Sequence, residues 1–229
     1  MDPEARENLD LTPLSAALRP HGVLVGARRI RPGDEAAAAV LVSGQIARRR
    51  ASGAARIAAR ILLGELGADP SAPLPRAPSG APCWPNGVVG SLAHDEEFAV
   101  AAAARRGRLL GLGIDVEPAE PLPEDIVDLV LLEAEQRETA GDRVAQRLVF
   151  VAKEAVYKAI HPLDGTPLDF SDIEVRLAEG QASLRDGRRL ELILFAGERL
   201  IAVALAFHCE TPVENSANLS VRLNNVRGL

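Results

Sequence analysis

Two acidic residues at the end of an apolar run are the first feature of this sequence that could do chemistry. Asp115 and Glu117 stand two residues apart in the segment 111–117, and the two-residue period of a strand aims both at the same face. Like charges this close repel, so either a cation lies between them or their pKa values rise. Carboxylate oxygens without a nearby His or Cys favour magnesium over zinc. The alternative is a solvated pair at a strand end, and the spacing alone leaves both open.

A second group of polar side chains lies on an expected helix further along the chain. Phe150, Glu154 and Lys158 share one stripe at i, i+4 and i+8 spacing. An acid on a face that begins apolar is a candidate for a reactive group. The alternative is a surface ion pair between Glu154 and Lys158 that contributes little, and Lys153 alone would be a solvated charge.

Taken together, these segments resemble the two signatures of the phosphopantetheinyl transferases, most closely those of the bacterial enterobactin-synthetase-associated branch. The first signature is matched by residues 113–117 and the second by residues 150–158. Upstream, the resemblance includes Trp84-Pro85, the segment Gly90 to His94, and a helix that carries Arg49, Arg50, Arg56 and Arg60. It covers most of residues 48–207.

Three positions depart from the pattern of that family. Phe150 stands where tryptophan is common, which is a conservative aromatic change. Ala93 precedes the histidine where many relatives have serine, which removes a possible phosphate hydrogen bond. Ala55 precedes Arg56 where glycine is usual, which affects only the local alignment of the arginines.

The resemblance implies an enzyme that moves a phosphopantetheinyl group from coenzyme A to a serine of an apo acyl or peptidyl carrier protein. The serine hydroxyl would attack the pantetheine-side phosphate and expel adenosine 3',5'-bisphosphate. The resemblance also implies that Asp115, Glu117 and Glu154 bind Mg²⁺ together with the pyrophosphate. Glu154 is the preferred general base, with Glu117 or a metal-bound water as rivals, and Lys158 would stabilise the leaving phosphate.

Further contacts to the phosphates of coenzyme A follow from the same resemblance. His94 would reach a phosphate from the first half of the chain, and Lys153 is expected to contact phosphate because an ammonium has no lone pair for a metal. A guanidinium can grip the 3'-phosphate with two parallel hydrogen bonds. Arg56 and Arg76 are the preferred residues for this role, and Arg49 and Arg50 are also candidates. The ordinary alternatives are a hydrogen-bonded histidine and arginines that solvate the outer face of a helix.

The secondary structure that must position these side chains can be predicted from periodicity and from breakers. Residues 34–67 indicate one or two helices broken near Ser52-Gly53, and residues 124–138 and 142–160 indicate two more. Residues 69–85 contain six prolines and predict an extended loop. The expected strands are 21–27, 87–91, 98–105, 109–116, 172–177, 181–184, 190–195 and 199–207.

Helices followed by an antiparallel sheet, twice over, predict an α+β fold of two similar halves. The resemblance relates the halves by a pseudo-two-fold axis. We expect an N-terminal half over residues 1–117, a C-terminal half over residues 118–209 and a polar tail over residues 210–229. Two halves in one chain can build the cleft by themselves, so we expect a monomer.

Composition sets the class of the protein. The chain has 229 residues, 47% of them apolar, and a net charge of −6, which permits a sizeable core and argues against general nucleic-acid binding. Arginines nevertheless crowd the first third of the chain, so a local anion site fits. Cys83 and Cys209 match no metal-site spacing, so we expect reduced thiols. Residues 1–7 lack the order of a signal peptide, and no apolar run approaches the ~20 residues of a membrane helix. We therefore expect a cytoplasmic protein.

Two other functions are compatible with three acids and a lysine. One is a magnesium-dependent phosphohydrolase of a nucleotide or pyrophosphate, which would need no protein acceptor. The other is a catalytically silent module that binds carrier proteins. The sequence does not identify the carrier or its pathway.

Overall fold

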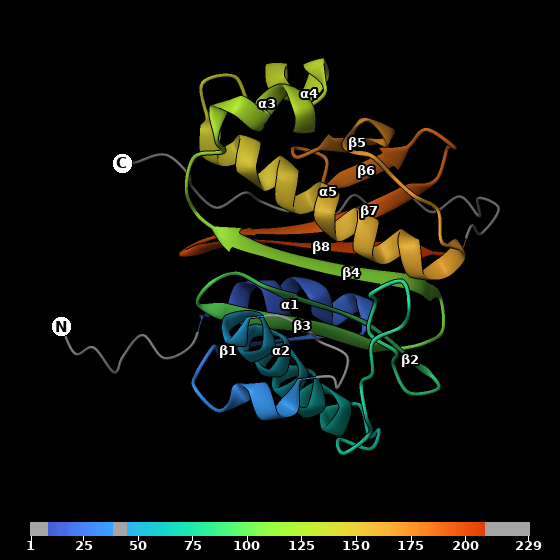
Figure 1. The fold of residues 1–229 in the computed structure, drawn as a ribbon. Helices are drawn as coiled ribbons and strands as arrows, with labels where there is room; N and C mark the ends of the chain where they lie inside the picture. The colour runs from blue at the N-terminus through green and yellow to red at the C-terminus, as the bar shows by residue number, and fades with distance from the viewer. Residues whose placement is uncertain (1–8, 39–44, 209–229) are drawn as a thin grey trace.

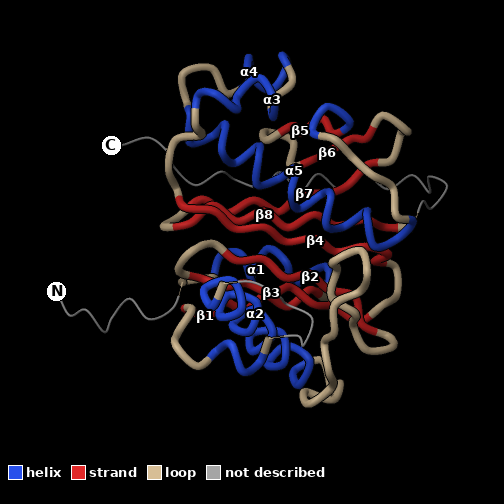
Figure 2. Tube along the Cα trace, viewed as in Figure 1, coloured by secondary structure: helices blue, strands red, loops and turns tan. Residues whose placement is uncertain are grey.

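The structure is a computed structural model that describes residues 9–38 and 45–208 of the chain. Two antiparallel sheets lie face to face, and a long helix covers the outer face of each (Figures 1 and 2). The expected thiol at Cys209 and the expected polar tail lie outside the described residues. The observed mixture of helices and antiparallel sheets confirms the α+β class.

The first half of the chain forms a three-stranded sheet with the order β1-β3-β2. These strands are β1 (Val23–Arg29), β2 (Val88–His94) and β3 (Phe98–Arg105). Helix α2 (Ile46–Glu65) packs its alanine- and leucine-rich face on the sheet, where Ala59 and Leu63 are fully buried. Two 3-10 helices, η2 (Arg19–His21) and η3 (Asp34–Ala37), flank β1.

The second half forms a five-stranded sheet with the order β4-β8-β7-β6-β5. The strands are β4 (Leu109–Pro118), β5 (Ile173–Arg176), β6 (Gln181–Leu184), β7 (Arg189–Ala196) and β8 (Arg199–Phe207). Helix α5 (Arg143–Asp164) covers this sheet, and the Asp142 side chain caps its first turn. Between β4 and α5 come η4 (Glu124–Ile126), α3 (Val127–Val130) and α4 (Glu133–Glu138), and η5 (Phe170–Asp172) precedes β5.

An apolar layer joins the two sheets. It contains Val100 and Ala102 of β3, Ile114 and Val116 of β4, and Val203 of β8. All five side chains are fully buried. Helix α1 (Thr12–Leu18) adds Leu14 and Leu18 to the same layer. The molecule is thus built as helix, sheet, sheet and helix (Figure 1).

Two expectations about this architecture are wrong. Helix α2 runs through Ser52-Gly53 without a break, because Gly53 serves packing: a Cβ there would lie 1.8 Å from the carbonyl oxygen of Asp34. The division after Glu117 is also misplaced, because β4 pairs along its length with β8 and is the first strand of the second sheet. The halves therefore divide at residues 106–108. The pseudo-two-fold relation stays a prediction.

The helix expected over 124–138 is divided into η4, α3 and α4. Leu131 and Leu132 adopt extended backbone conformations between α3 and α4. Among the described residues, no helix has the length and apolar character needed to cross a membrane.

Candidate functional site

Two glycines bring helix α5 unusually close to strand β4. A Cβ at Gly113 would lie 1.8 Å from the carbonyl oxygen of Ala155, and one at Gly111 would lie 2.3 Å from that of Ala159. Side chains at these positions would therefore push the helix off the strand. The close approach places Glu154 and Lys158 of α5 opposite the acidic end of β4.

Asp115 forms an ion pair with Lys158 across this contact. The Lys158 Nζ atom donates to Asp115 Oδ1 at 2.5 Å. Asp115 is 7% exposed, and burial raises its pKa although the ammonium of Lys158 opposes the shift. The expected stripe of α5 thus faces the strand that carries the first acidic pair.

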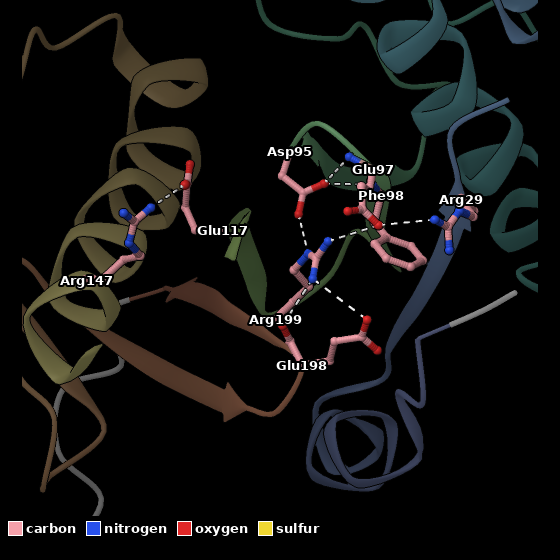
Figure 3. A network of polar contacts seen from close by, with 8 residues as sticks. All are labelled: Arg29, Asp95, Glu97, Phe98, Glu117, Arg147, Glu198 and Arg199. Atoms are coloured by element: carbon pink, nitrogen blue, oxygen red, sulfur yellow. Dashed lines mark hydrogen bonds and ion pairs between the residues drawn. The ribbon is translucent and has the colours of Figure 1, made fainter. Parts of the chain in front are cut away.

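Glu117 lies one strand period beyond Asp115 and is paired with Arg147 (Figure 3). The Arg147 Nη1 atom donates to Glu117 Oε2 at 3.1 Å, and Nη2 donates to the carbonyl oxygen of Pro121 at 2.9 Å. Burial raises the pKa of Glu117, and the charge of Asp115 raises it further. Each carboxylate of β4 therefore has a cation of α5 as its partner.

Glu154 is half-buried between these two ion pairs along α5. Burial raises its pKa above that of an ordinary glutamate, and the charge of Asp115 adds to the shift while Lys158 opposes it. The charge of Asp115 thus acts on both glutamates.

The expected three-carboxylate metal site is not preassembled. Within residues 9–38 and 45–208, no three His, Cys, Asp or Glu side chains form a ligand set for one ion, and Lys158 and Arg147 hold two of the expected ligands. The donor set still suits a hard cation, because all three groups are carboxylates whose mutual repulsion a divalent ion would relieve. The residues fit Mg²⁺ in chemistry, and they need local rearrangement to surround it.

A pocket lined by cationic side chains lies beside this acidic site. Its volume is about 210 Å³, and Arg48, Arg56, Arg76 and His94 line it. Arg56 is only 6% exposed and is held by Leu74 O at 2.9 Å from Nε and by Ser52 Oγ at 2.6 Å from Nη1. Burial lowers its pKa, and the positive charges of Arg76 and Arg60 lower it further. No acidic residue lines this pocket among the described residues, so its chemistry is that of an anion site.

A larger cavity of about 630 Å³ lies between the two halves. The first half contributes Trp84 and Ser91, and α5 contributes Glu154, Tyr157 and Lys158. Gly90 leaves room for the Trp84 indole, since a Cβ there would lie 2.5 Å from its Cζ2 atom. The cavity shares Arg76, Gly80, Pro82 and Leu92 with the cationic pocket. The two form one trough.

A smaller hollow of about 270 Å³ opens on the other side of Glu154. Glu154 and Tyr157 line it together with Leu168 and Phe170. Glu154 therefore stands where the main cavity and this half-apolar hollow meet.

His94 ends β2 at the border between the halves. Its imidazole lines the cationic pocket, and burial lowers its pKa, with a smaller contribution from the positive charge of Lys158. The first half thus presents a histidine to the part of the second half that carries Asp115 and Lys158.

The expectation that Lys153 contacts phosphate is wrong. Its side chain is 0% exposed, and Nζ donates to Glu135 Oε2 at 2.7 Å, to Val130 O at 2.8 Å and to Phe170 O at 3.0 Å. These three bonds use all the donors of the ammonium. Burial lowers the pKa of Lys153 although Glu135 opposes the shift. Lys153 ties α5 to α4 and to the segments before α4 and β5, and it lines neither the main cavity nor the cationic pocket.

Among the arginines, the structure favours Arg48 over Arg49. Arg49 is exposed and lines none of the three cavities described above, whereas Arg48 lines the cationic pocket. Arg50 is paired with Glu35 at 3.1 Å. The signal that could have identified Arg48 is its spacing, because residues 48, 52 and 56 lie on one helical stripe.

Comparisons with known proteins agree with this geometry. The family model of the 4'-phosphopantetheinyl transferase N-terminal domain matches residues 35–104, and that of the 4'-phosphopantetheinyl transferase superfamily matches residues 111–204. The boundary between the two matches falls where β4 begins the second sheet.

Three characterised proteins are similar to most of the chain. The 4'-phosphopantetheinyl transferase Svp of Streptomyces mobaraensis is 39% identical over 170 residues, which cover 66% of this chain and 69% of Svp. Npt of Nocardia iowensis is 39% identical over 156 residues, covering 66% and 70%. PptT of Mycobacterium tuberculosis is 37% identical over 167 residues, covering 71% and 73%.

The solved Thermotoga maritima holo-[acyl-carrier-protein] synthase aligns with 43% of this chain and 64% of its own, at 26% identity and a TM-score of 0.37. The assignment of the fold comes from the sheets and helices described above. The enterobactin-associated branch stays a prediction.

Proposed function

Because the chain belongs to the 4'-phosphopantetheinyl transferase superfamily, we propose that coenzyme A lies along the trough between its halves and that the carrier serine meets it at Glu154. The enzyme transfers the 4'-phosphopantetheinyl group of coenzyme A to a serine hydroxyl of an apo carrier protein and releases adenosine 3',5'-bisphosphate. One observation carries the placement: a trough that runs from a pocket lined by three arginines and a histidine to Glu154 and Lys158, which lie beside Asp115.

The 3'-phosphate of coenzyme A belongs in the cationic pocket. A phosphate dianion matches the three arginines of the pocket, Arg48, Arg56 and Arg76, and His94 can donate a hydrogen bond to it. The positive charge of Arg76 disfavours that of Arg56 in the absence of an anion. The Nε and Nη1 atoms of Arg56 are held by Leu74 and Ser52, so its guanidinium is already oriented. Pre-organisation of this kind lowers the entropic cost of binding.

The pyrophosphate then reaches the acidic site at the other end of the trough. Asp115, Glu117 and Glu154 would hold Mg²⁺ there, and the bound ion would neutralise and orient the pyrophosphate. For this, Lys158 and Arg147 must release the two carboxylates that they hold in the structure. Lys158, freed from Asp115, is the group on α5 that can pair with a phosphate oxygen.

Glu154 is the proposed general base. It takes the proton of the serine hydroxyl as the serine oxygen bonds to the pantetheine-side phosphorus, and the bond to the bridging oxygen breaks. Lys158 stabilises the negative charge that develops on the departing adenosine 3',5'-bisphosphate. A raised pKa suits this role, because a base works best when its pKa approaches the working pH. Glu117 is the rival base.

The hollow beyond Glu154 is the proposed site of the pantetheine arm. Leu168, Phe170 and Ile173 supply its apolar lining, and Tyr157 and Asp169 supply polar groups, a mixture that suits an aliphatic chain with amide groups. The phosphate to be attacked would then lie between the two cavities, next to Glu154, which lines both.

We further propose that the protein acts as a cytoplasmic monomer. Both halves of the trough come from one chain, so no second copy is needed to complete it. Light scattering tests this proposal, and a trimer mass would contradict it.

Calorimetric titration with coenzyme A and with 3'-dephospho-coenzyme A tests the placement of the substrate. The native enzyme should bind coenzyme A more tightly, and Arg56→Ala should lose a large part of this preference, because Arg48, Arg76 and His94 still line the pocket. Arg49→Ala is the matched control and should keep the preference, because Arg49 is an exposed arginine next to Arg48 that does not line the pocket. An undiminished preference in Arg56→Ala would contradict the assignment of the cationic pocket. Titration with and without Mg²⁺ tests whether the pyrophosphate end needs the metal.

A further inference from the structure

A buried ion pair joins the two halves of the molecule next to the proposed site. Asp95 follows His94 at the end of β2, and Arg199 is the first residue of β8. The Arg199 Nε atom donates to Asp95 Oδ2 at 2.5 Å, and the two side chains are only 10% and 4% exposed (Figure 3). The pair connects residues 104 positions apart in the sequence.

The Asp95 carboxylate also shapes the turn between β2 and β3. Its Oδ1 atom accepts hydrogen bonds from the backbone N–H groups of Glu97 at 2.7 Å and of Phe98 at 2.6 Å. The Arg199 guanidinium lies over the ring of Phe98, with Cζ 5.0 Å from the ring centroid. One oxygen therefore orders the turn, and the other fastens it to the second half.

One end of this pair adjoins a residue of the proposed site, and the other end lies on the strand beside β4. His94 immediately precedes Asp95, and Arg199 pairs in register with Pro118, the neighbour of Glu117. Most of the contact between the sheets is the apolar layer described above, which is non-directional. The ion pair of His21 with Glu191 lies on other elements, η2 and β7, so near His94 the directional contact between the halves is that of Arg199 with Asp95 and Glu97. A directional ion pair with hydrogen-bond geometry fixes the lateral position of the halves there.

We propose that Asp95 and Arg199 are a positioning pair: they hold His94 at its distance from the β4 carboxylates and so set the affinity for coenzyme A without touching it. The proposal rests on the proposed function in one respect, the assignment of His94 to a phosphate of coenzyme A. A buried ion pair is by itself weak evidence for a contribution to stability, which makes a role in placement the more informative one to test.

The decisive variant is Asp95→Asn. The asparagine oxygen can still accept the two backbone hydrogen bonds of the turn, while its amide nitrogen, a donor, replaces the oxygen that accepts from Arg199. The change therefore removes the ion pair and its hydrogen bond and keeps the turn. Glu97→Gln is the matched control, because Glu97 contacts the same arginine at 3.4 Å but is half exposed. His94→Ala and the double variant Asp95→Asn/His94→Ala complete a cycle.

Calorimetry with coenzyme A should give about tenfold weaker binding for Asp95→Asn, which corresponds to about 1.4 kcal/mol, and unchanged binding for Glu97→Gln. The double variant should bind no more weakly than His94→Ala, because the pair acts through the histidine. In turnover, the KM for coenzyme A should rise while the KM for the carrier stays constant.

Two results would overturn the positioning role alone: native affinity in Asp95→Asn, or effects that add in the double variant. Native affinity in His94→Ala would remove the phosphate contact from the proposed function and the positioning role with it. If Asp95→Asn is not folded, Arg199→Lys enters the same cycle, since it keeps the charge but loses the planar guanidinium over Phe98.

Discussion

Replacement of Gly113 by alanine tests how the enzyme aligns Glu154 and Lys158 of α5 with Asp115 of β4. The new Cβ would lie 1.8 Å from the carbonyl oxygen of Ala155 and 2.7 Å from the amide nitrogen of Ala159, where ordinary contact begins at 3.4 Å. The backbone of α5 must therefore move away from β4 by roughly 1.6 Å at this point, because no flexible side chain can yield.

This displacement separates Glu154 and Lys158 from Asp115. A misplacement of about 1 Å can cost about 10²-fold in rate, so we expect the turnover of Gly113→Ala to fall by about 10²-fold or more. Overpacking should also lower the free energy of unfolding by about 1–3 kcal/mol. Rates are followed by the mass gain of an apo carrier protein, and stability by urea unfolding.

Gly107→Ala is the matched control, because a Cβ there would meet nothing within 4 Å. It should keep native turnover and stability. Gly111→Ala, with its 2.3 Å contact, should fall between the two. Native turnover in a folded Gly113→Ala enzyme would refute the argument that the close helix–strand contact aligns the site.

Three further predictions concern the buried lysine, the general base and the metal. Lys153→Met should lower the free energy of unfolding in urea by about 3–5 kcal/mol, because it leaves the Glu135 carboxylate buried and unpaired. The double variant Lys153→Met/Glu135→Gln should recover most of this loss. Equal stability of the single and double variants would contradict the prediction. The acid limb of the kcat/KM profile, which reports the free enzyme, should have its midpoint above 4.5, the ordinary value for glutamate, since the base must be deprotonated and burial raises the pKa of Glu154 in the ligand-free protein. A midpoint at or below 4.5 would contradict Glu154 as the base. Chelation of divalent metal should abolish turnover, and Mg²⁺ should restore it; full turnover in chelator would contradict the assigned ligands.

The ligand-free protein should also respond to pH through this glutamate. The folded-state pKa of Glu154 is raised, so protonation stabilises the fold at low pH and this contribution is lost as the pH rises through the raised pKa. The pH dependence of urea unfolding should therefore differ between the native protein and Glu154→Gln, with the native protein losing stability relative to the variant as the pH rises. Parallel curves would contradict the burial of this charge.

Local periodicity predicted much of the secondary structure. Strands β3, β6 and β8 match the predicted ranges residue for residue, because short apolar runs bounded by turn residues leave little choice of boundary. The site acids also lie where strand and helix periods predicted, with Asp115 facing Lys158. Periodicity specifies the face on which a side chain lies.

What failed depended on contacts between segments far apart in the sequence. The burial of Lys153 requires Glu135, 18 residues upstream, and carbonyl groups of two further segments, and no local pattern marks them. Gly53 was interpreted as a helix breaker, but its role is to admit the backbone of Asp34. The assignment of β4 to the second sheet depends on β8, about 90 residues later. The Asp95–Arg199 ion pair could not be predicted from the sequence for the same reason, because its residues are 104 positions apart.

Intact-mass spectrometry of an apo carrier protein incubated with the enzyme, coenzyme A and Mg²⁺ tests the central claim most directly. The account predicts a gain of one phosphopantetheinyl group with the native enzyme, and no gain with Glu154→Ala or without Mg²⁺. Transfer by Glu154→Ala at the native rate would contradict the proposed role of Glu154. Cleavage of coenzyme A with no carrier gaining mass would indicate a phosphohydrolase, and intact coenzyme A with unmodified fatty-acid, polyketide and peptide carriers would indicate a silent binding module.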